Sequence, residues 1–191
     1  MNLNLKKLFF WQSKKDYLTV FDHSLFGEIN LIICNYSIWI FFFIISYFLI
    51  RQDINYFGRL FFATLIAEVV ERYLKKKKYW IRPMFNRRSV APAGLVNNWY
   101  HSGSFPSGHT IKATFFLFFI ITASSFSLPL FLIITIPLLS FRVLVGFHYP
   151  IDILGGILLG ILIWFLTKDL IFPDVLNNLI KIIFNFVFSI S

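Results

Sequence analysis

Five long apolar stretches divide the chain, and three short segments and one long polar segment, residues 75–109, separate them. The first, residues 31–50, carries no charge over 20 residues and is long enough to cross a hydrocarbon core of about 30 Å as a helix. The others are residues 54–74, 110–126, 128–147 and 151–167. This pattern predicts an all-α fold, a polytopic membrane bundle of about five transmembrane helices, with six as the alternative.

The two ends of the chain mix apolar and charged residues. In residues 3–28 apolar side chains alternate with lysines, which is typical of a helix at the level of the lipid headgroups, and a disordered tail is the alternative. Residues 170–191 contain Asp174, Lys181 and three asparagines, so we expect an amphipathic surface helix rather than a sixth span. The predicted organisation is an interfacial segment (1–28), a membrane-embedded core (29–168) and a C-terminal tail (169–191).

Composition supports a membrane location and restricts the partners. Hydrophobic residues make up 58% of the chain, above the roughly 45–50% usual for soluble domains. A net charge of +9 among so few charges suits anionic lipid or an anionic substrate. Nucleic acid is not expected, because the basic residues do not line a soluble face, and no obligate protein partner is evident. Cys34 is the only cysteine, which excludes an intrachain disulfide and a thiolate metal site.

The connection between the second and third apolar stretches is polar and basic. Just before it, Glu68 and Arg72 are i,i+4 neighbours that can pair, and we expect the helix to leave the bilayer near Glu68. The charges would then not need to be buried. Lys76 to Lys78 read as a positive anchor, and Trp80 as an aromatic residue of the membrane interface.

A helix start with free backbone donors is predicted at Ser107, directly before the third apolar stretch. Pro106 lacks an N–H group and Ser107 is a favoured N-cap residue. The first N–H groups of a helix form a site for anions, and Gly108 lets an anion approach the backbone closely. His109 would stand beside that anion and could donate a proton. A plain helix cap with a lone histidine is the alternative.

Two further polar clusters are expected on the same membrane face as this helix start. In a bundle of five alternating spans, the second and fourth helices end where the third and fifth begin. Lys75 and Arg82 follow the second span, and Arg142 lies in the fourth, where an ionisable residue is costly and is a candidate for function. Together with the donors of Ser107 and Gly108, these cations can bind phosphate oxygens.

His148 has a carboxylate within reach. Pro150 suits the first position of the fifth helix, so Asp152 would lie in its first turn and could reach back to His148. A carboxylate on one imidazole nitrogen fixes the tautomer and leaves the other nitrogen as a nucleophile. An interfacial histidine beside a helix start is the alternative.

The order and spacing of these residues resemble the type 2 phosphatidic acid phosphatase superfamily. The resemblance covers about residues 55–167 and rests on three motifs. They are Lys-x6-Arg-Pro (Lys75 to Pro83), Pro-Ser-Gly-His (Pro106 to His109) and Arg-x5-His-x3-Asp (Arg142 to Asp152). One departure is that Phe141 separates Ser140 from Arg142, where the family has Ser directly before Arg, so no role carries over to Ser140.

The resemblance implies metal-independent hydrolysis of a lipid phosphate or diphosphate ester, with no cofactor. His148 would form a phosphohistidine, His109 would protonate the leaving oxygen, and the cations would stabilise the transferring group. The substrate would be an anionic phospholipid, an isoprenoid diphosphate or lipid A. A lipid-to-lipid phosphotransferase on the same site and an inactive protein that binds anionic lipid remain alternatives.

We expect an integral protein of the bacterial inner (plasma) membrane. The side of the site stays open, because the excess of basic residues favours the cytoplasm and the resemblance favours the outer face.

Overall fold

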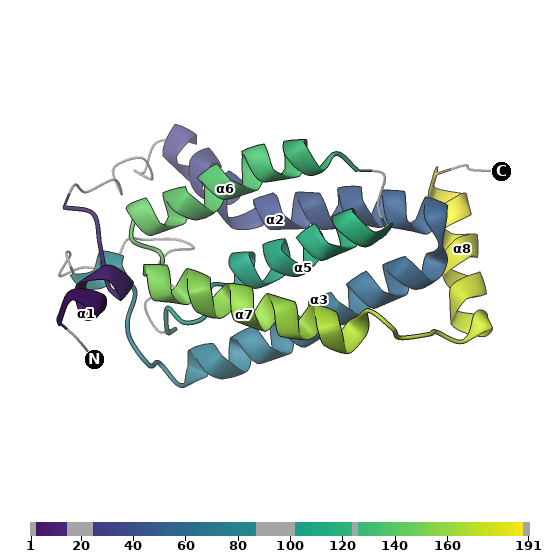
Figure 1. Ribbon diagram of the computed structural model, residues 1–191. Helices are drawn as coiled ribbons and strands as arrows, with labels where there is room; N and C mark the ends of the chain where they lie inside the picture. The colour runs from purple at the N-terminus through teal and green to yellow at the C-terminus, as the bar shows by residue number, and fades with distance from the viewer. Residues whose placement is uncertain (1–2, 15–24, 87–101, 124–125, 189–191) are drawn as a thin grey trace.

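A computed structural model describes residues 3–14, 25–86, 102–123 and 126–188. Within these ranges every regular element is a helix, so the all-α prediction is confirmed there (Figure 1). The five long helices run alongside one another as a bundle. They are α2 (Leu25–Gln52), α3 (Ile54–Lys76), α5 (Gly108–Ala123), α6 (Leu128–Leu144) and α7 (Pro150–Thr167).

Shorter elements lie at the two ends of the bundle. Helix α1 (Leu3–Phe9) and the 3-10 helix η2 (Pro83–Asn86) lie at the end where α5 and α7 begin (Figure 1). Helix α8 (Asp174–Phe188) runs across the opposite end. There Asn177 Nδ2 donates to Asn55 Oδ1 over 3.2 Å, which fastens α8 to the start of α3.

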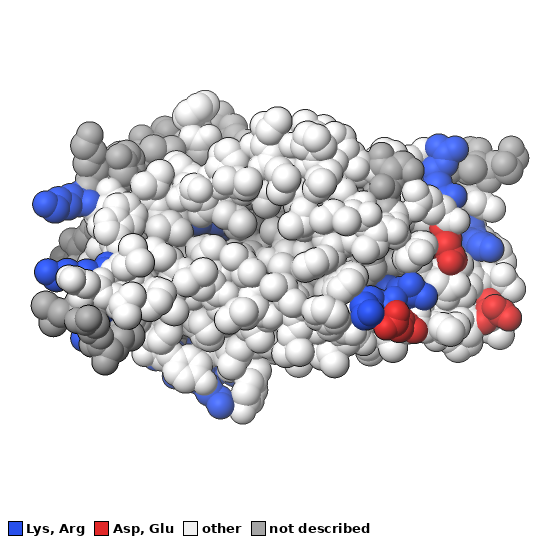
Figure 2. All heavy atoms as spheres, viewed as in Figure 1, with Lys and Arg blue, Asp and Glu red and all other residues white. Residues whose placement is uncertain are grey.

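The lengths of the helices bear on how many of them cross a membrane. By length and composition, α2 and α7 are long and apolar enough to do so. Helices α5 and α6 are apolar but have 16 and 17 residues, fewer than the roughly 20 that a perpendicular crossing needs. On the face shown in Figure 2, charged side chains gather towards the two ends of the bundle and the middle is mostly uncharged.

Helix α5 is the centre of the bundle and packs against α2, α3, α6 and α7. Its side chains Ile111, Phe115 and Phe116 are fully buried. The closest approach is to α7, where a Cβ atom on Gly160 would come within 2.6 Å of the Ile111 carbonyl oxygen. Small residues of α7 thus allow close packing of α5 and α7.

Several helix boundaries differ from the expected ones. The fourth span was expected to reach residue 147, but α6 ends at Leu144 because Gly146 adopts a positive φ of 88°. The Gly146 carbonyl accepts the Met84 N–H over 2.9 Å, which anchors this turn. Helix α5 begins at Gly108, and Ile111 N–H donates to the Ser107 carbonyl over 3.0 Å, so Ser107 occupies the predicted cap position.

Candidate active site

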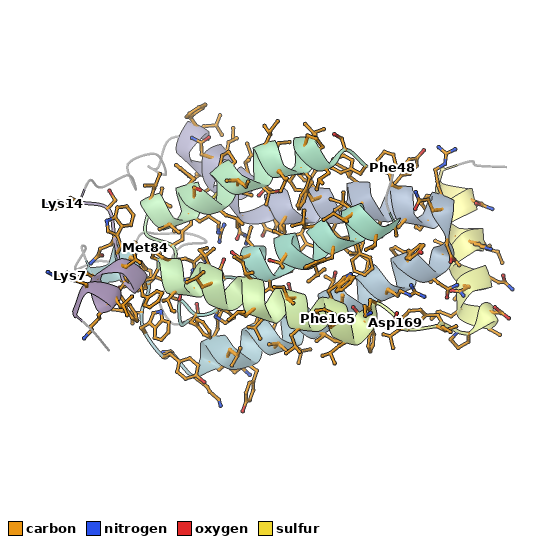
Figure 3. The ribbon with its side chains drawn as sticks, viewed as in Figure 1. Lys7, Lys14, Phe48, Met84, Phe165 and Asp169 are labelled. Atoms are coloured by element: carbon orange, nitrogen blue, oxygen red, sulfur yellow. The ribbon has the colours of Figure 1, made fainter. Side chains whose placement is uncertain are left out.

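All of the predicted site residues lie at the end of the bundle where α3 and α6 end and α5 and α7 begin. This is the end at which Figure 3 labels Met84. Contacts join the separate segments: Ser107 N–H donates to the Asp152 carbonyl over 3.1 Å, and Arg142 Nη1 lies 3.4 Å from His109 Nε2. The structure therefore brings together residues that are up to 77 positions apart, from Lys75 to Asp152.

His148 and Asp152 face each other in the interior. The distance between His148 Nδ1 and Asp152 Oδ2 is 3.4 Å, and the two side chains are 1% and 0% exposed. Among the described residues this imidazole nitrogen has no well-aligned hydrogen bond, so the contact is one of proximity and charge. Burial lowers the pKa of His148 below its ordinary value, and the positive charges of Arg82 and Arg142 act in the same direction. At neutral pH the imidazole is therefore uncharged.

The carboxylate of Asp152 is held by neutral donors from three places in the chain. Trp80 Nε1 donates to Oδ1 over 2.9 Å, and the Tyr149 N–H donates to Oδ2 over 2.8 Å. The hydroxyl of Ser104 also donates to Oδ2. The Tyr149 bond follows from the local sequence, because Pro150 starts the helix and Asp152 at its third position caps the preceding N–H group.

Two buried arginines lie near His148. Arg82 Nη1 donates to the Phe147 carbonyl over 3.2 Å, and Arg142 Nη1 donates to the Cys34 carbonyl over 2.8 Å. Burial and the charge of Arg142 lower the pKa of Arg82 to about 10, so its guanidinium stays charged at neutral pH. In the described part of the chain, the buried Nε of Arg142 has no hydrogen-bond partner. A guanidinium N–H is thus left for an oxygen of a ligand.

The charges of α3 are placed differently from what the sequence indicated. The expected pair between Glu68 and Arg72 is present, at 3.6 Å. However, Glu68 Oε1 also lies 2.7 Å from Nζ of Lys112, a lysine of α5 whose side chain is only 5% exposed. The carboxylate of Glu71 contacts both Lys112 and Lys75. Glu68, Glu71 and Lys75 are therefore partly buried while Arg72 is exposed, and pairing between α3 and α5 compensates for the partial burial.

The sequence pattern did not single out four side chains of this region as parts of a site. Trp80 was interpreted as an interfacial residue and Ser104 was assigned no role, yet both donate to the Asp152 carboxylate. Glu71 and Lys112 form an ion pair between helices. Only Lys112 carried a usable signal, because a lysine inside an apolar stretch is costly unless it is paired.

The comparisons with known proteins place the chain in a family. The model of the PAP2 superfamily matches residues 56–176. The chain belongs to the PAP2 superfamily. No curated protein and no solved structure matches the chain. Membership of the PAP2 superfamily confirms the resemblance drawn from the three motifs and indicates phosphatase-type hydrolysis of phosphoesters.

Proposed function

We propose that this PAP2 protein is a membrane phosphatase that hydrolyses lipid phosphate or diphosphate esters through a phosphohistidine. The observation that carries the proposal is the surroundings of His148. This buried imidazole, neutral at pH 7, has a carboxylate 3.4 Å from one ring nitrogen. The positive charges of Arg82, Arg142 and Lys75 also act on this imidazole. Such a set can position a phosphoryl group and stabilise the charge of its transition state.

In the proposed reaction, Nε2 of His148 attacks phosphorus, and the bond from phosphorus to the lipid oxygen breaks. His109 gives a proton to the departing oxygen, while Asp152 stabilises the charge that develops on the imidazole of His148. Water then attacks the phosphohistidine, passes a proton back to His109 and releases inorganic phosphate. Lys75, Arg82, Arg142, the hydroxyl of Ser107 and the backbone N–H of Gly108 would bind the phosphoryl oxygens. The clamp itself requires no metal.

A lipid substrate is supported by an apolar cavity beside the site. The cavity has a volume of about 650 Å³ and lies between α1, α6 and α7. Its wall includes Val143, next to Arg142, and Pro150, two residues after His148. A hydrocarbon chain could therefore lie in this cavity while the phosphate reaches the site. Ser140, which is exposed, is part of the cavity wall.

We further propose that all five long helices cross the membrane, with the N-terminus and the site on one side and α8 on the other. The proposal is supported by the bundle, in which α1 and α8 lie at opposite ends (Figure 1). Cysteine labelling at residues 4 and 188, in a Cys34→Ser background, should report opposite sides. Labelling of both positions from one side would contradict five spans.

The activity is tested by measuring inorganic phosphate release from four substrates. Purified protein in mixed micelles would receive phosphatidic acid, phosphatidylglycerophosphate, undecaprenyl diphosphate or lipid A, each with excess EDTA. We expect release from at least one of them, and a ³²P label on the wild-type protein after acid-free quenching. Loss of substrate without free phosphate would favour a lipid-to-lipid phosphotransferase. Binding of the lipids without turnover would favour the inactive lipid-binding alternative.

A further inference from the structure

Four charged side chains meet between α3 and α5, at the edge of the proposed phosphate site. Lys112 Nζ lies 2.7 Å from Glu68 Oε1 and 3.2 Å from Glu71 Oε2. Lys75, one turn further along α3, donates to Glu71 Oε1. Only Lys75 has a role in the proposed reaction. Glu68, Glu71 and Lys112 therefore have no role in the proposed reaction.

The carboxylate of Glu71 lies directly against Gly108, the first residue of α5. A Cβ atom added to Gly108 would lie 1.9 Å from Glu71 Oε2 and 2.1 Å from Oε1, far closer than any real contact. The carboxylate thus fills the space that a side chain at Gly108 would take. An anion that approached Gly108 from this side would have to displace the Glu71 carboxylate.

We propose that Glu71 is the resident anion of the phosphate site between turnovers, and that substrate phosphate displaces it from Gly108 and Lys75. The inference rests on the proposed phosphatase function. The displaced carboxylate would stay paired with Lys112, whose ammonium already contacts it at 3.2 Å. Glu71 is therefore a positioning residue, which acts through Lys75 and by competition with the phosphate.

The physical reason lies in the charges that converge on the site. Lys75, Arg82 and Arg142 are close enough to influence His148 electrostatically, and buried cations that are not compensated are costly. A carboxylate next to Lys75 lowers that cost when no phosphate is bound. The Glu71 carboxylate would compete with the product as well as with the substrate. It would therefore also weaken the binding of inorganic phosphate. Product release would then be faster than from a site of cations alone.

Glu68 provides a matched control for Glu71. Both carboxylates contact Lys112, but only that of Glu71 touches Gly108 and Lys75. The experiment is equilibrium binding of ³²P-labelled inorganic phosphate to the detergent-purified wild type, Glu71→Gln and Glu68→Gln. We expect Glu71→Gln to bind phosphate about tenfold more tightly than wild type, the effect of removing one nearby like charge. Glu68→Gln should stay within about twofold.

A second variant covers the case in which Glu71→Gln does not fold. Glu71→Asp keeps the charge that compensates Lys112 but withdraws the carboxylate from Gly108 by one methylene. We expect it to bind phosphate more tightly than wild type and less tightly than Glu71→Gln.

The outcomes separate the two proposals. If wild type hydrolyses lipid phosphate and binds inorganic phosphate, but neither Glu71 variant binds it more tightly, only the inference on Glu71 is overturned. If wild type neither hydrolyses nor binds phosphate, the proposed function and the inference both fall.

Discussion

Asp152, which is buried, and Glu71, which is partly buried, are two carboxylates at the same end of the bundle, and their partners differ in kind. Asp152 accepts hydrogen bonds from Trp80, Ser104 and a backbone N–H, all of them neutral and directional. Glu71 contacts the ammonium groups of Lys75 and Lys112. Because an ammonium is a point charge on a flexible stem, it can exchange one anion for another, whereas fixed neutral donors hold a carboxylate in one orientation. The donors around Asp152 hold its carboxylate in one orientation, and the lysines around Glu71 compensate its charge.

The largest effect is expected from removing His148, the proposed nucleophile. His148→Ala should lower kcat by at least about a thousandfold, because it removes the imidazole that is proposed to form the phosphohistidine. Phosphate release and the ³²P-protein adduct should disappear together. Size-exclusion elution and thermal unfolding identical to wild type would show that the loss is chemical. Near-normal turnover in a folded His148→Ala protein would refute the assignment of the nucleophile.

Neutralising the carboxylate of Asp152 should have the next largest effect. Asp152→Asn keeps the shape of the side chain, but it removes the charge proposed to stabilise the imidazolium and puts an NH2 group, which cannot accept, against one set of donors. We therefore expect kcat to fall by about a thousandfold with a smaller change in KM. The matched control is Asp169→Asn at the opposite end of the bundle (Figure 3), where the carboxylate side chain is 82% exposed. That control should stay within about twofold. Equal effects of both substitutions would contradict a special role for Asp152.

His109→Ala should separate proton transfer from phosphate binding. We expect kcat to fall about a hundredfold for a lipid alcohol as leaving group, because the departing alkoxide then lacks its proton donor. With a nitrophenyl phosphate, whose leaving group needs little protonation, the loss should be below about tenfold. The measurement is kcat for the two substrates in wild type and variant. A uniform loss would indicate that His109 binds the phosphate and does not transfer the proton.

The pH profile should report the surroundings of His148. Burial, and then the charges of Arg82 and Arg142, lower the pKa of His148 below the ordinary histidine value of 6.5. The imidazole therefore stays neutral at pH values somewhat below 6.5. After correction for ionisation of the substrate, the acidic limb of kcat/KM should therefore lie below pH 6.5. Arg82→Gln removes one positive charge, which makes protonation easier and should move this limb to higher pH. A wild-type limb above 6.5 would contradict the proposed electrostatics.

The smallest effect is expected from removing one neutral donor to Asp152. Trp80→Phe deletes the indole N–H and keeps an aromatic ring near Phe10, so activity should fall by about three- to tenfold. Trp164→Phe is a matched control, since its buried indole N–H has no partner among the described residues. If both variants behaved like wild type, Ser104 and the Tyr149 N–H alone would suffice to orient the carboxylate.

The amino-acid sequence by itself determined the helices and the end of the bundle at which the chemistry lies. Long apolar stretches with few charges leave few alternatives to a helix, and their alternation brings Lys75, His109 and His148 to one end. Helix starts at Gly108 and Pro150 followed from local rules of capping, which depend only on neighbouring residues. The end of α6 was missed by three residues, since a glycine in an apolar run does not reveal its φ angle.

Only the tertiary structure decided which side chains meet between the helices. A helix that is apolar on all sides contains no information on which face it turns to a neighbour. The contact of Lys112 with Glu68 and Glu71 depends on the rotation of α5 against α3, and the bonds of Trp80 and Ser104 to Asp152 join segments 72 and 48 residues apart. Such contacts depend on how the helices pack, and packing is a property of the whole bundle.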